Sequence, residues 1–256
     1  RAQQYFRGMD DLQAIFASQA PNPSGYDCLA LLSGGKDSTY MVTRLVDMGL
    51  SVLAFTLDNG YISDQAKTNI KAVVARLGVD HIFGSTPAMN EIFVDSLQRH
   101  ANVCQGCFKT IYTLSIKLAK DKGIPFIVTG LSRGQFFETR LTEEIFTSPD
   151  FDVERVDDTI LAARKAYHKV NDAANQLLDV TVFEDEQVFE RVRFVDFYRY
   201  CPVDLAEMLT YLEQRAGWKR PSDTGRSTNC LINDVGIYVH QMQRGYHNYA
   251  LPYSWD

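Results

Sequence analysis

Short apolar runs alternate with longer segments of helical periodicity as far as residue 140. The apolar runs have the length of buried strands and span residues 27–32, 51–57, 79–83 and 124–129. The segments between them place apolar residues three and four positions apart and span residues 36–48, 64–77, 88–100 and 108–120. Strands that alternate with helices of this length predict an α/β fold with a doubly wound parallel sheet.

The pattern is less regular on either side of this core. Residues 1–18 predict an amphipathic helix, which a proline-rich stretch ends. Beyond residue 140 we expect a long helix over 156–178, a strand over 191–197, and a helix from Pro202 to residue 212. We therefore divide the chain into an N-terminal helix and linker (1–25), a central α/β core (26–140), and a mostly helical extension that completes the domain (141–256).

The first predicted strand leads directly into a glycine turn that opens the next helix. The turn reads Ser33-Gly34-Gly35-Lys36-Asp37-Ser38-Thr39. Backbone N–H groups and the positive end of a helix dipole make such a turn an anion site, to which Lys36 adds charge and three hydroxyls add donors. The common P-loop has Ser or Thr directly after its lysine, whereas Asp37 stands here. Beside phosphates this acid requires a divalent cation, so we expect a site for phosphates and Mg²⁺.

The run from Ser33 to Ser38 resembles the signature of the PP-loop superfamily, the N-type ATP pyrophosphatases of the HUP-like fold (adenine nucleotide alpha-hydrolase-like). The resemblance implies that the chain binds ATP and Mg²⁺ on residues 33–39, transfers AMP to an acceptor oxygen and releases pyrophosphate. Lys36 and Asp37 would be catalytic. The resemblance also assigns roles to four later residues: Asp58 and Gly130 would contact the nucleotide, and Lys109 and Arg133 would flank the triphosphate as further catalytic residues. A turn residue at Asp58 and a plain helix start at Arg133 are the alternatives.

Five cysteines give the chain a second candidate chemistry: Cys28, Cys104, Cys107, Cys201 and Cys230. Their odd number argues against a disulfide framework. The pair in Cys104-Gln105-Gly106-Cys107 lies just before a predicted helix. Two thiols at this spacing can bind a metal or a cluster, or act as a redox pair.

The segments around this pair and around Gly130 resemble the central part of PP-loop sulfur transferases. In the cluster-dependent members, such a pair and one later cysteine hold a [4Fe-4S] cluster whose fourth iron stays open. The resemblance thus implies Cys104, Cys107 and Cys230 as the metal ligands, with Cys201 as a rival third ligand. Zn²⁺ is the alternative, with Cys201 or His240 as fourth ligand, and free thiols are another. Cys28 is interpreted as a core residue.

Charge and composition limit the classes of substrate and partner that we expect. The net charge of −6 disfavours a tRNA substrate, since proteins that grip a nucleic-acid backbone are usually basic. No apolar stretch reaches the length of a membrane span, and we expect a cytoplasmic protein. The acceptor would be a small molecule or a group on a carrier protein. A start at Arg1 and an end at Asp256 favour a part of a larger multidomain chain, and a homodimer is the alternative.

These observations predict an ATP-dependent adenylating enzyme that activates an acceptor oxygen and transfers sulfur to it through a cluster or a persulfide. An alternative is an amidotransferase, because residues 226–236 and 245–255 also resemble ExsB-like and N-acetyl sugar amidotransferase-like members, in which ammonia is the nucleophile. A third reading is a non-catalytic ATP-binding module, which the presence of Lys36 and Asp37 disfavours. The loop from Asp223 to Arg226 could close over the site.

Overall fold

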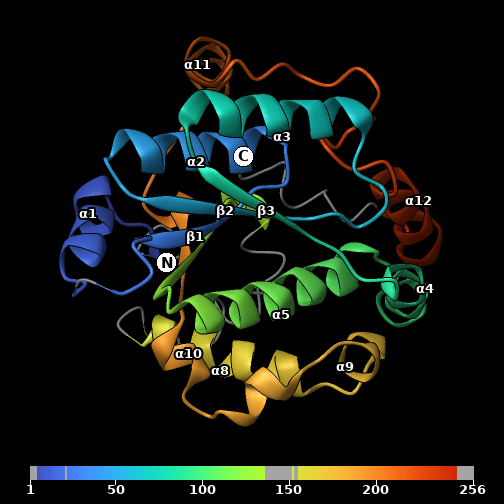
Figure 1. Cartoon of the computed structure of the whole chain (residues 1–256). Helices are drawn as coiled ribbons and strands as arrows, with labels where there is room; N and C mark the ends of the chain where they lie inside the picture. The colour runs from blue at the N-terminus through green and yellow to red at the C-terminus, as the bar shows by residue number, and fades with distance from the viewer. Residues whose placement is uncertain (1–4, 21, 136–151, 153–154, 247–256) are drawn as a thin grey trace.

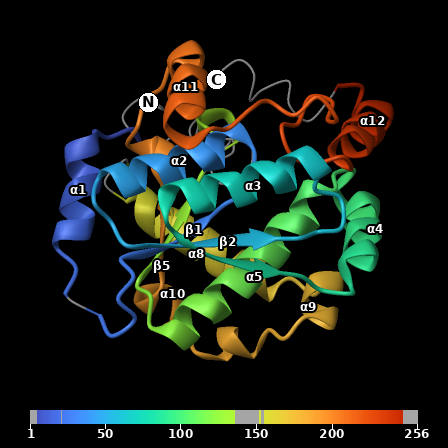
Figure 2. The same ribbon diagram turned by 45° about the horizontal axis from the view of Figure 1, so that its top comes forward.

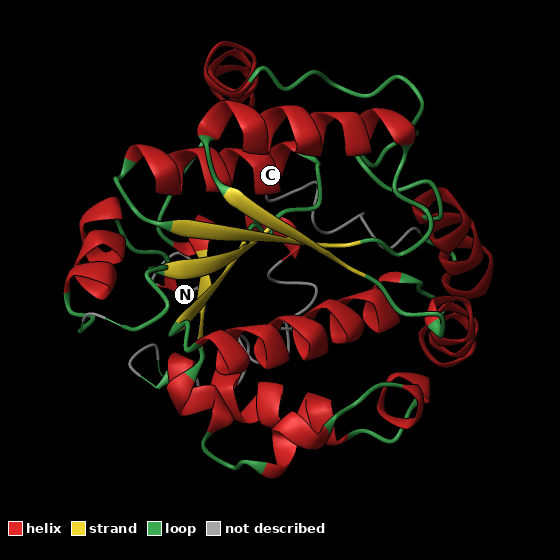
Figure 3. Cartoon of the chain, in the orientation of Figure 1, coloured by secondary structure: helices red, strands yellow, loops and turns green. Residues whose placement is uncertain are grey.

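A five-stranded sheet forms the centre of the molecule, whose computed structural model describes residues 5–20, 22–135, 152 and 155–246. Its strand order is β3-β2-β1-β4-β5, and every pairing in this sheet is parallel. The strands are β1 (Cys28–Leu31), β2 (Val52–Leu57), β3 (Asp80–Gly84), β4 (Phe126–Thr129) and β5 (Arg193–Asp196). Helices lie on both sides of this sheet (Figure 3), which confirms the predicted α/β class.

The helices form two layers and a cap at one end of the sheet (Figure 1). The first layer contains α2 (Lys36–Asp47), α3 (Asp64–Leu77) and α11 (Leu205–Tyr211), with α1 (Met9–Ala17) at its side. The second contains α5 (Cys104–Lys122), α8 (Val156–Lys169) and α10 (Val188–Arg191), with α9 (Ala173–Leu177) beyond. The end cap consists of α4 (Met89–His100) and α12 (Asn233–Arg244). Short turns complete the elements: η2 (Thr181–Glu184), η3 (Phe197–Arg199) and the π-helical η4 (Leu212–Ala216).

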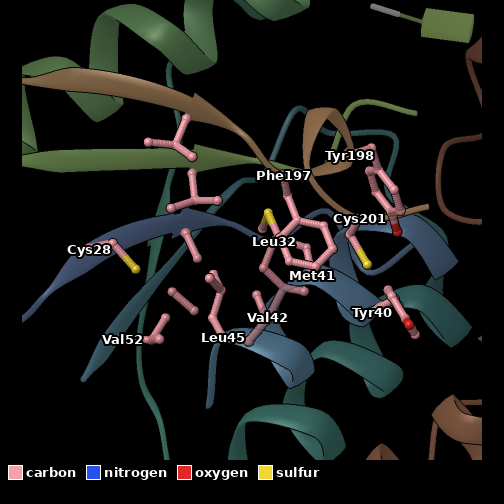
Figure 4. Close-up of a cluster of buried hydrophobic side chains, with 14 of the residues drawn as sticks. Cys28, Leu32, Tyr40, Met41, Val42, Leu45, Val52, Phe197, Tyr198 and Cys201 are labelled. Atoms are coloured by element: carbon pink, nitrogen blue, oxygen red, sulfur yellow. The ribbon is translucent and has the colours of Figure 1, made fainter. Parts of the chain in front are cut away.

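Alternate residues of β1 explain why the sheet needs helices on both faces. Cys28 and Ala30 point into the core beneath α2, where they pack with Met41 (Figure 4). Leu29 and Leu31 point into the opposite core, against α5. All four strand residues are buried, as expected of a parallel sheet covered on both sides. Cys28 is therefore a core residue, as predicted.

Several predicted boundaries agree with the structure, because their signals are local. Helix α3 has the predicted bounds: the Ser63 hydroxyl accepts the N–H of Ala66, and Gly78 ends the helix in the left-handed region at φ 67°. Helix α1 is shorter than predicted and begins at Met9, since the N–H of Gly8 is taken by the Asp11 carboxylate.

Two aspartates correct the predictions beyond residue 140. The single helix predicted over 156–178 is wrong: α8 ends at Lys169, and α9 restarts after Asp172, whose carboxylate accepts the N–H of Asn175. Pro202 does not open α11. Asp204 does, by accepting the N–H groups of Ala206 and Glu207. In both places a capping carboxylate, rather than periodicity or proline, determines where the helix starts.

The fold gathers distant segments beyond the carboxyl ends of the strands. Helices α4 and α12 lie close together at this end in both views (Figures 1 and 2). A single antiparallel bridge joins Ile62, which follows β2, to Cys230, which precedes α12. In open parallel sheets this edge is where ligands bind. Within the described residues, no helix is long and apolar enough to cross a membrane.

Candidate functional site

The glycine turn between β1 and α2 has the geometry of an anion cradle. Gly35 caps α2 in an extended conformation, and Lys36 is the first helical residue. Gly34 has φ +83°, and an added Cβ there would lie 2.9 Å from Cγ1 of Ile70. The Gly34 carbonyl accepts the indole N–H of Trp218 at 2.8 Å. Positive φ and close packing both require glycine at position 34.

The hydroxyls of the turn divide into two that face the cavity and one that does not. Ser38 Oγ accepts the N–H of Ser33 at 3.0 Å and lies 3.0 Å from Ser33 Oγ. Both serines line the cavity described below. Thr39 is fully buried behind the turn and lies outside that lining. The structure therefore brings Ser33 and Ser38 to the expected position and leaves Thr39 in the core.

Lys36 and Asp37 are neighbours in space as well as in sequence. The Lys36 ammonium lies 2.7 and 2.9 Å from the two carboxylate oxygens of Asp37, and about a quarter of each side chain is exposed. The backbone carbonyl of Asp37 accepts the hydroxyl of Tyr198, which fixes the first turn of α2. For Lys36 to meet a phosphate and Asp37 a cation, this ion pair must open. Partial exposure makes that opening inexpensive.

A cavity of about 220 Å³ opens beside this turn, beyond the ends of the strands. Its walls come from the glycine turn, the ends of β1, β2 and β4, the start of α5, and the segment before α12. The residues that line it are Leu31, Ser33, Gly35, Asp37, Ser38, Leu57, Asn59, Ile62, Cys104, Cys107, Phe108, Ile111, Tyr112, Thr129, Gly130, Leu131, Gln135, Ser227, Thr228, Asn229, Cys230 and Asn233. Asp37 is the one charged side chain in this lining as far as the structure describes it.

Three of the five cysteines lie in the wall of this cavity. Cys104 and Cys107 occupy the first turn of α5, which begins at Cys104 rather than at the predicted residue 108. Cys230 reaches the same place from the other end of the chain, through its bridge to Ile62. A spacing of three residues puts Cys104 and Cys107 on one side of the helix. The structure thus places the three predicted ligands in the wall of one cavity.

Two asparagine amides face the sulfurs. Asn59 Nδ2 lies 3.7 Å from Sγ of Cys107 and 3.7 Å from Sγ of Cys230. Its Oδ1 accepts the N–H of Tyr61, so the amide orientation is fixed with its NH₂ toward the two sulfurs. Asn233 Nδ2 lies 3.8 Å from Sγ of Cys104. Asn59 is buried, and the sequence alone did not single it out.

Burial is the main influence on the thiols. It raises the pKa of Cys107 well above its usual range, and the hydrogen bond from Asn59 opposes this rise. The pKa of Cys230 is raised for the same reason, while Asn59 and the N–H groups of Ile232 and Asn233 lower it. The donors therefore stabilise the negative sulfur that metal binding or nucleophilic attack requires.

The residues proposed as further metal ligands do not lie in this cavity. Cys201 is buried in the other core, beside Tyr40 and Tyr198 (Figure 4), and His240 lies on α12 with its Nδ1 at the carbonyl of Tyr246. Among the described residues, no group of three His, Cys, Asp or Glu side chains is close enough to hold a metal ion. Cys104, Cys107 and Cys230 are therefore not close enough together to form a metal site in this structure, and neither Cys201 nor His240 lies where a fourth zinc ligand is needed.

Two residues that were predicted to contact the nucleotide or its phosphates, Lys109 and Asp58, also lie outside the cavity lining. Lys109 is 1% exposed on the far side of α5, where its ammonium donates to Asp172 at 2.7 Å and to the carbonyl of Val170 at 2.8 Å. Burial lowers the pKa of Lys109, and the hydrogen bond to Asp172 opposes this effect. Asp58 Oδ1 accepts the N–H of Gly60, and its Oδ2 pairs with a lysine of α3.

Arg133 belongs to a different environment again. Its Nε donates to the carbonyl of Tyr198 at 3.1 Å, and its guanidinium stacks over the ring of Phe6. Desolvation lowers the pKa of Arg133. Gly130, in contrast, lines the cavity directly beside Ser38.

The segment before α12 contributes Thr228, which the sequence did not single out, and Asp223, which it did. Thr228 Oγ1 accepts the backbone N–H of Lys36 at 3.2 Å. Asp223, expected on a loop that closes over the site, accepts the N–H of Gln65 at the start of α3. These contacts hold the segment against the first turns of α2 and α3. No local pattern marks such residues, because their partners lie more than 150 positions away.

One protein-family model and one curated protein are similar to this chain in sequence. The family model of the queuosine biosynthesis protein QueC matches residues 27–113, which include the glycine turn and both cysteines of α5. An uncharacterised protein of Methanocaldococcus jannaschii is 21% identical over 232 residues, which cover 90% of this chain. This chain spans 65% of the length of that curated relative.

Two solved structures are also similar. One is the NMN synthetase of Francisella tularensis, with 12% identity and a TM-score of 0.38, covering 80% of this chain and 90% of that one. The other is a 4-thiouridine synthetase in complex with RNA and ATP, with 15% identity and a TM-score of 0.39, covering 66% of this chain and 55% of that one.

Proposed function

Because this chain belongs to the PP-loop superfamily, we propose that it adenylates an acceptor oxygen with ATP and then transfers sulfur to the activated carbon. One observation carries the proposal. Three cysteines from distant parts of the chain line the same cavity as the glycine turn, so the groups for both half-reactions face one space.

The first half-reaction uses the glycine turn. The N–H groups at the start of α2 and the hydroxyls of Ser33 and Ser38 bind the β and γ phosphates of ATP. Lys36 leaves Asp37 and neutralises the charge that develops on the leaving pyrophosphate, and Asp37 becomes a ligand of Mg²⁺. The acceptor oxygen forms a bond to the α phosphorus while the bond from that phosphorus to the bridging oxygen breaks. Pyrophosphate leaves, and the acceptor carries AMP.

The second half-reaction uses the thiols. A sulfur nucleophile attacks the activated carbon, the carbon–oxygen bond to AMP breaks, and AMP leaves with the electron pair. The donor set suits a [4Fe-4S] cluster better than zinc, because three cysteines and three side-chain N–H···S contacts are present without a fourth protein ligand among the described residues. Cys104, Cys107 and Cys230 would hold the cluster, which would supply an open iron for a sulfide. Because the three thiols are not close enough together to hold a metal in this structure, they would have to move closer when it binds.

The acceptor is proposed to be a small molecule or a group on a carrier protein. The acidic chain and a cavity lining that carries one carboxylate and no described cation fit a neutral acceptor better than a polyanionic one.

Pyrophosphate release tests the first half-reaction. Lys36→Ala should lower the rate of ATP-dependent pyrophosphate release by about 100-fold or more, since one preorganised charge contact is lost. Lys67→Ala is the matched control: Lys67 pairs with Asp58 outside the cavity, and its loss should leave the rate unchanged. If both variants keep wild-type rates, the glycine turn is not the nucleotide site.

The iron and labile sulfide content of the purified protein tests the second half-reaction. Protein prepared without oxygen should contain about four irons per chain. Cys230→Ser should reduce that content strongly, and Cys201→Ser, in the opposite core, should not. A colourless, iron-free wild-type protein would exclude the cluster.

Ammonia is the second candidate nucleophile, because residues 226–236 and 245–255 also resemble members of the superfamily in which ammonia attacks the activated carbon. Isotopically labelled donors distinguish sulfur transfer from ammonia transfer. Incorporation of ¹⁵N from ammonium, with no sulfur in the product, assigns an amidotransferase.

A further inference from the structure

Residues 227–230 form a hydrogen-bonded turn that connects the glycine turn to the sulfur site. Ser227 Oγ accepts the N–H groups of Asn229 at 3.3 Å and of Cys230 at 3.1 Å, so the segment (turn 227–230) is one unit. Its outer side is held by the N–H of Ser63, which donates to the carbonyl of Asn229 at 2.9 Å. Thr228 and Cys230, two residues apart in this turn, both line the cavity.

Thr228 accepts a hydrogen bond from a backbone N–H group that a bound phosphate would also use. Its Oγ1 accepts the N–H of Lys36, the first residue of α2, at 3.2 Å. An added Cβ on Gly35 would lie only 2.9 Å from this oxygen, so turn 227–230 lies in direct contact with the cradle. The first N–H groups of a helix have no partner within the helix and are the donors that phosphates take. The threonine hydroxyl therefore stands where a phosphate oxygen would bind.

We propose that Thr228 is a positioning residue that links occupancy of the glycine turn to the placement of Cys230. This inference rests on the ATP-binding part of the proposed function. A charged phosphate oxygen is a stronger acceptor than a hydroxyl and takes the N–H of Lys36 from Thr228. Turn 227–230 is then released from the cradle, and Cys230 moves relative to Asn59 and Cys107. The sulfur site is thus set for its half-reaction only when nucleotide is present.

Linkage makes the relationship reciprocal. A change that removes the Thr228 contact should therefore not weaken nucleotide binding, because the phosphate no longer has to displace the threonine hydroxyl. Thr228→Val keeps the shape of the side chain and removes the accepting oxygen, whereas Thr228→Ser keeps the oxygen. Thr224→Val makes the same chemical change in the preceding loop. Thr228→Ser and Thr224→Val therefore serve as the two controls.

The rate at which iodoacetamide alkylates Cys230 measures this coupling. The full chain is freed of metal by chelation, and the alkylation of each cysteine is followed by mass spectrometry, with and without Mg²⁺ and α,β-methylene-ATP. In the wild type and in both controls, nucleotide should raise the Cys230 rate by about fivefold or more. Cys201, in the opposite core, should not respond. Thr228→Val should show the raised rate without nucleotide and no further response.

Calorimetry of nucleotide binding on the same samples separates the possible failures. If the wild type binds no nucleotide, the ATP part of the proposed function fails, and this inference fails with it. If nucleotide binds and the Cys230 rate stays the same or falls, the Thr228 link alone is overturned. Affinity for nucleotide in Thr228→Val should equal or exceed that of the wild type. A loss of about tenfold would make Thr228 a direct phosphate ligand and would also overturn the link.

Discussion

A Cβ added to Gly130 would lie 2.8 Å from the Cα of Ser38. The end of β4 therefore touches the first turn of α2 with no side chain between them. This contact fixes the distance between the cradle and the wall of the cavity opposite the cysteines. The requirement at position 130 is steric, because the competing atoms belong to backbone.

Gly130→Ala should destabilise the fold and the cradle together. The added methyl group forces α2 away from β4, at a cost of about 1–3 kcal/mol in the free energy of unfolding. Urea denaturation measures that cost, and pyrophosphate release should fall with it because the N–H groups of the cradle are displaced. Gly8→Ala provides the comparison, since its added Cβ meets only an oxygen of Asp11 at 4.0 Å. Wild-type activity in Gly130→Ala would show that the backbone around residue 130 can accommodate the added methyl group.

Lys109 and Asp172 should behave as a structural ion pair. Asp172→Ala leaves the Lys109 ammonium buried without its carboxylate and should cost about 3–5 kcal/mol in the free energy of unfolding. The double variant Lys109→Met, Asp172→Leu should recover most of this loss. Urea denaturation measures both. Lys117→Met, which breaks an exposed pair on the same helix, should change little. A double variant as unstable as the single one would contradict this explanation.

The position of Lys109 follows from helix geometry that the sequence alone left ambiguous. With α5 starting at Cys104, Lys109 lies two residues past Cys107 and is therefore rotated by about 200° from it. A helix start at residue 108 hid this relationship. Asn102 explains the earlier start, since its Oδ1 accepts the N–H of Cys104 at 2.7 Å.

Contiguous features could be predicted, and features made by distant residues could not. The glycine turn carries its geometry in six consecutive residues, and the alternation of apolar runs predicts the parallel sheet. Asn59 and Thr228 gain their roles only from partners across the fold, and their neighbours in sequence resemble ordinary turns. Cys230 could be proposed as a ligand only through resemblance, because nothing near it distinguishes it from Cys201.

Asn59→Leu should weaken the three-cysteine site while leaving the fold intact. Loss of the N–H donors shared by Cys107 and Cys230 is expected to lower iron affinity by about 10- to 100-fold. The rate of iron loss to a chelator measures this effect. Asn90→Leu makes the same change on the exposed face of α4 and should lose iron at the wild-type rate. Equal rates of iron loss in both variants would contradict a role for Asn59 in the three-cysteine site.

His81 should make stability depend on pH. Burial lowers the pKa of His81 in the folded chain, whereas the unfolded chain has an ordinary pKa of about 6.5. Below that pH the unfolded state binds the extra proton, so stability falls as the pH drops through the unfolded pKa. Urea midpoints at about pH 7.5 and 5.5 test this sign. His81→Gln should reduce the difference between the two urea midpoints. His100→Gln, on the exposed end of α4, should leave that difference unchanged. An unchanged profile in His81→Gln would exclude this histidine as the source.

The bridge between Ile62 and Cys230 also determines the order in which the site is completed as the chain leaves the ribosome. Asn59 and Cys107 are separated by 48 positions, and Asn59 and Cys230 by 171. Synthesis therefore produces the cradle and two thiols long before the third. Until residue 230 emerges, the nascent chain presents a cysteine pair without its enclosing segment. The three thiols can consequently share one cavity only after the segment around Cys230 has folded back over the end of the sheet.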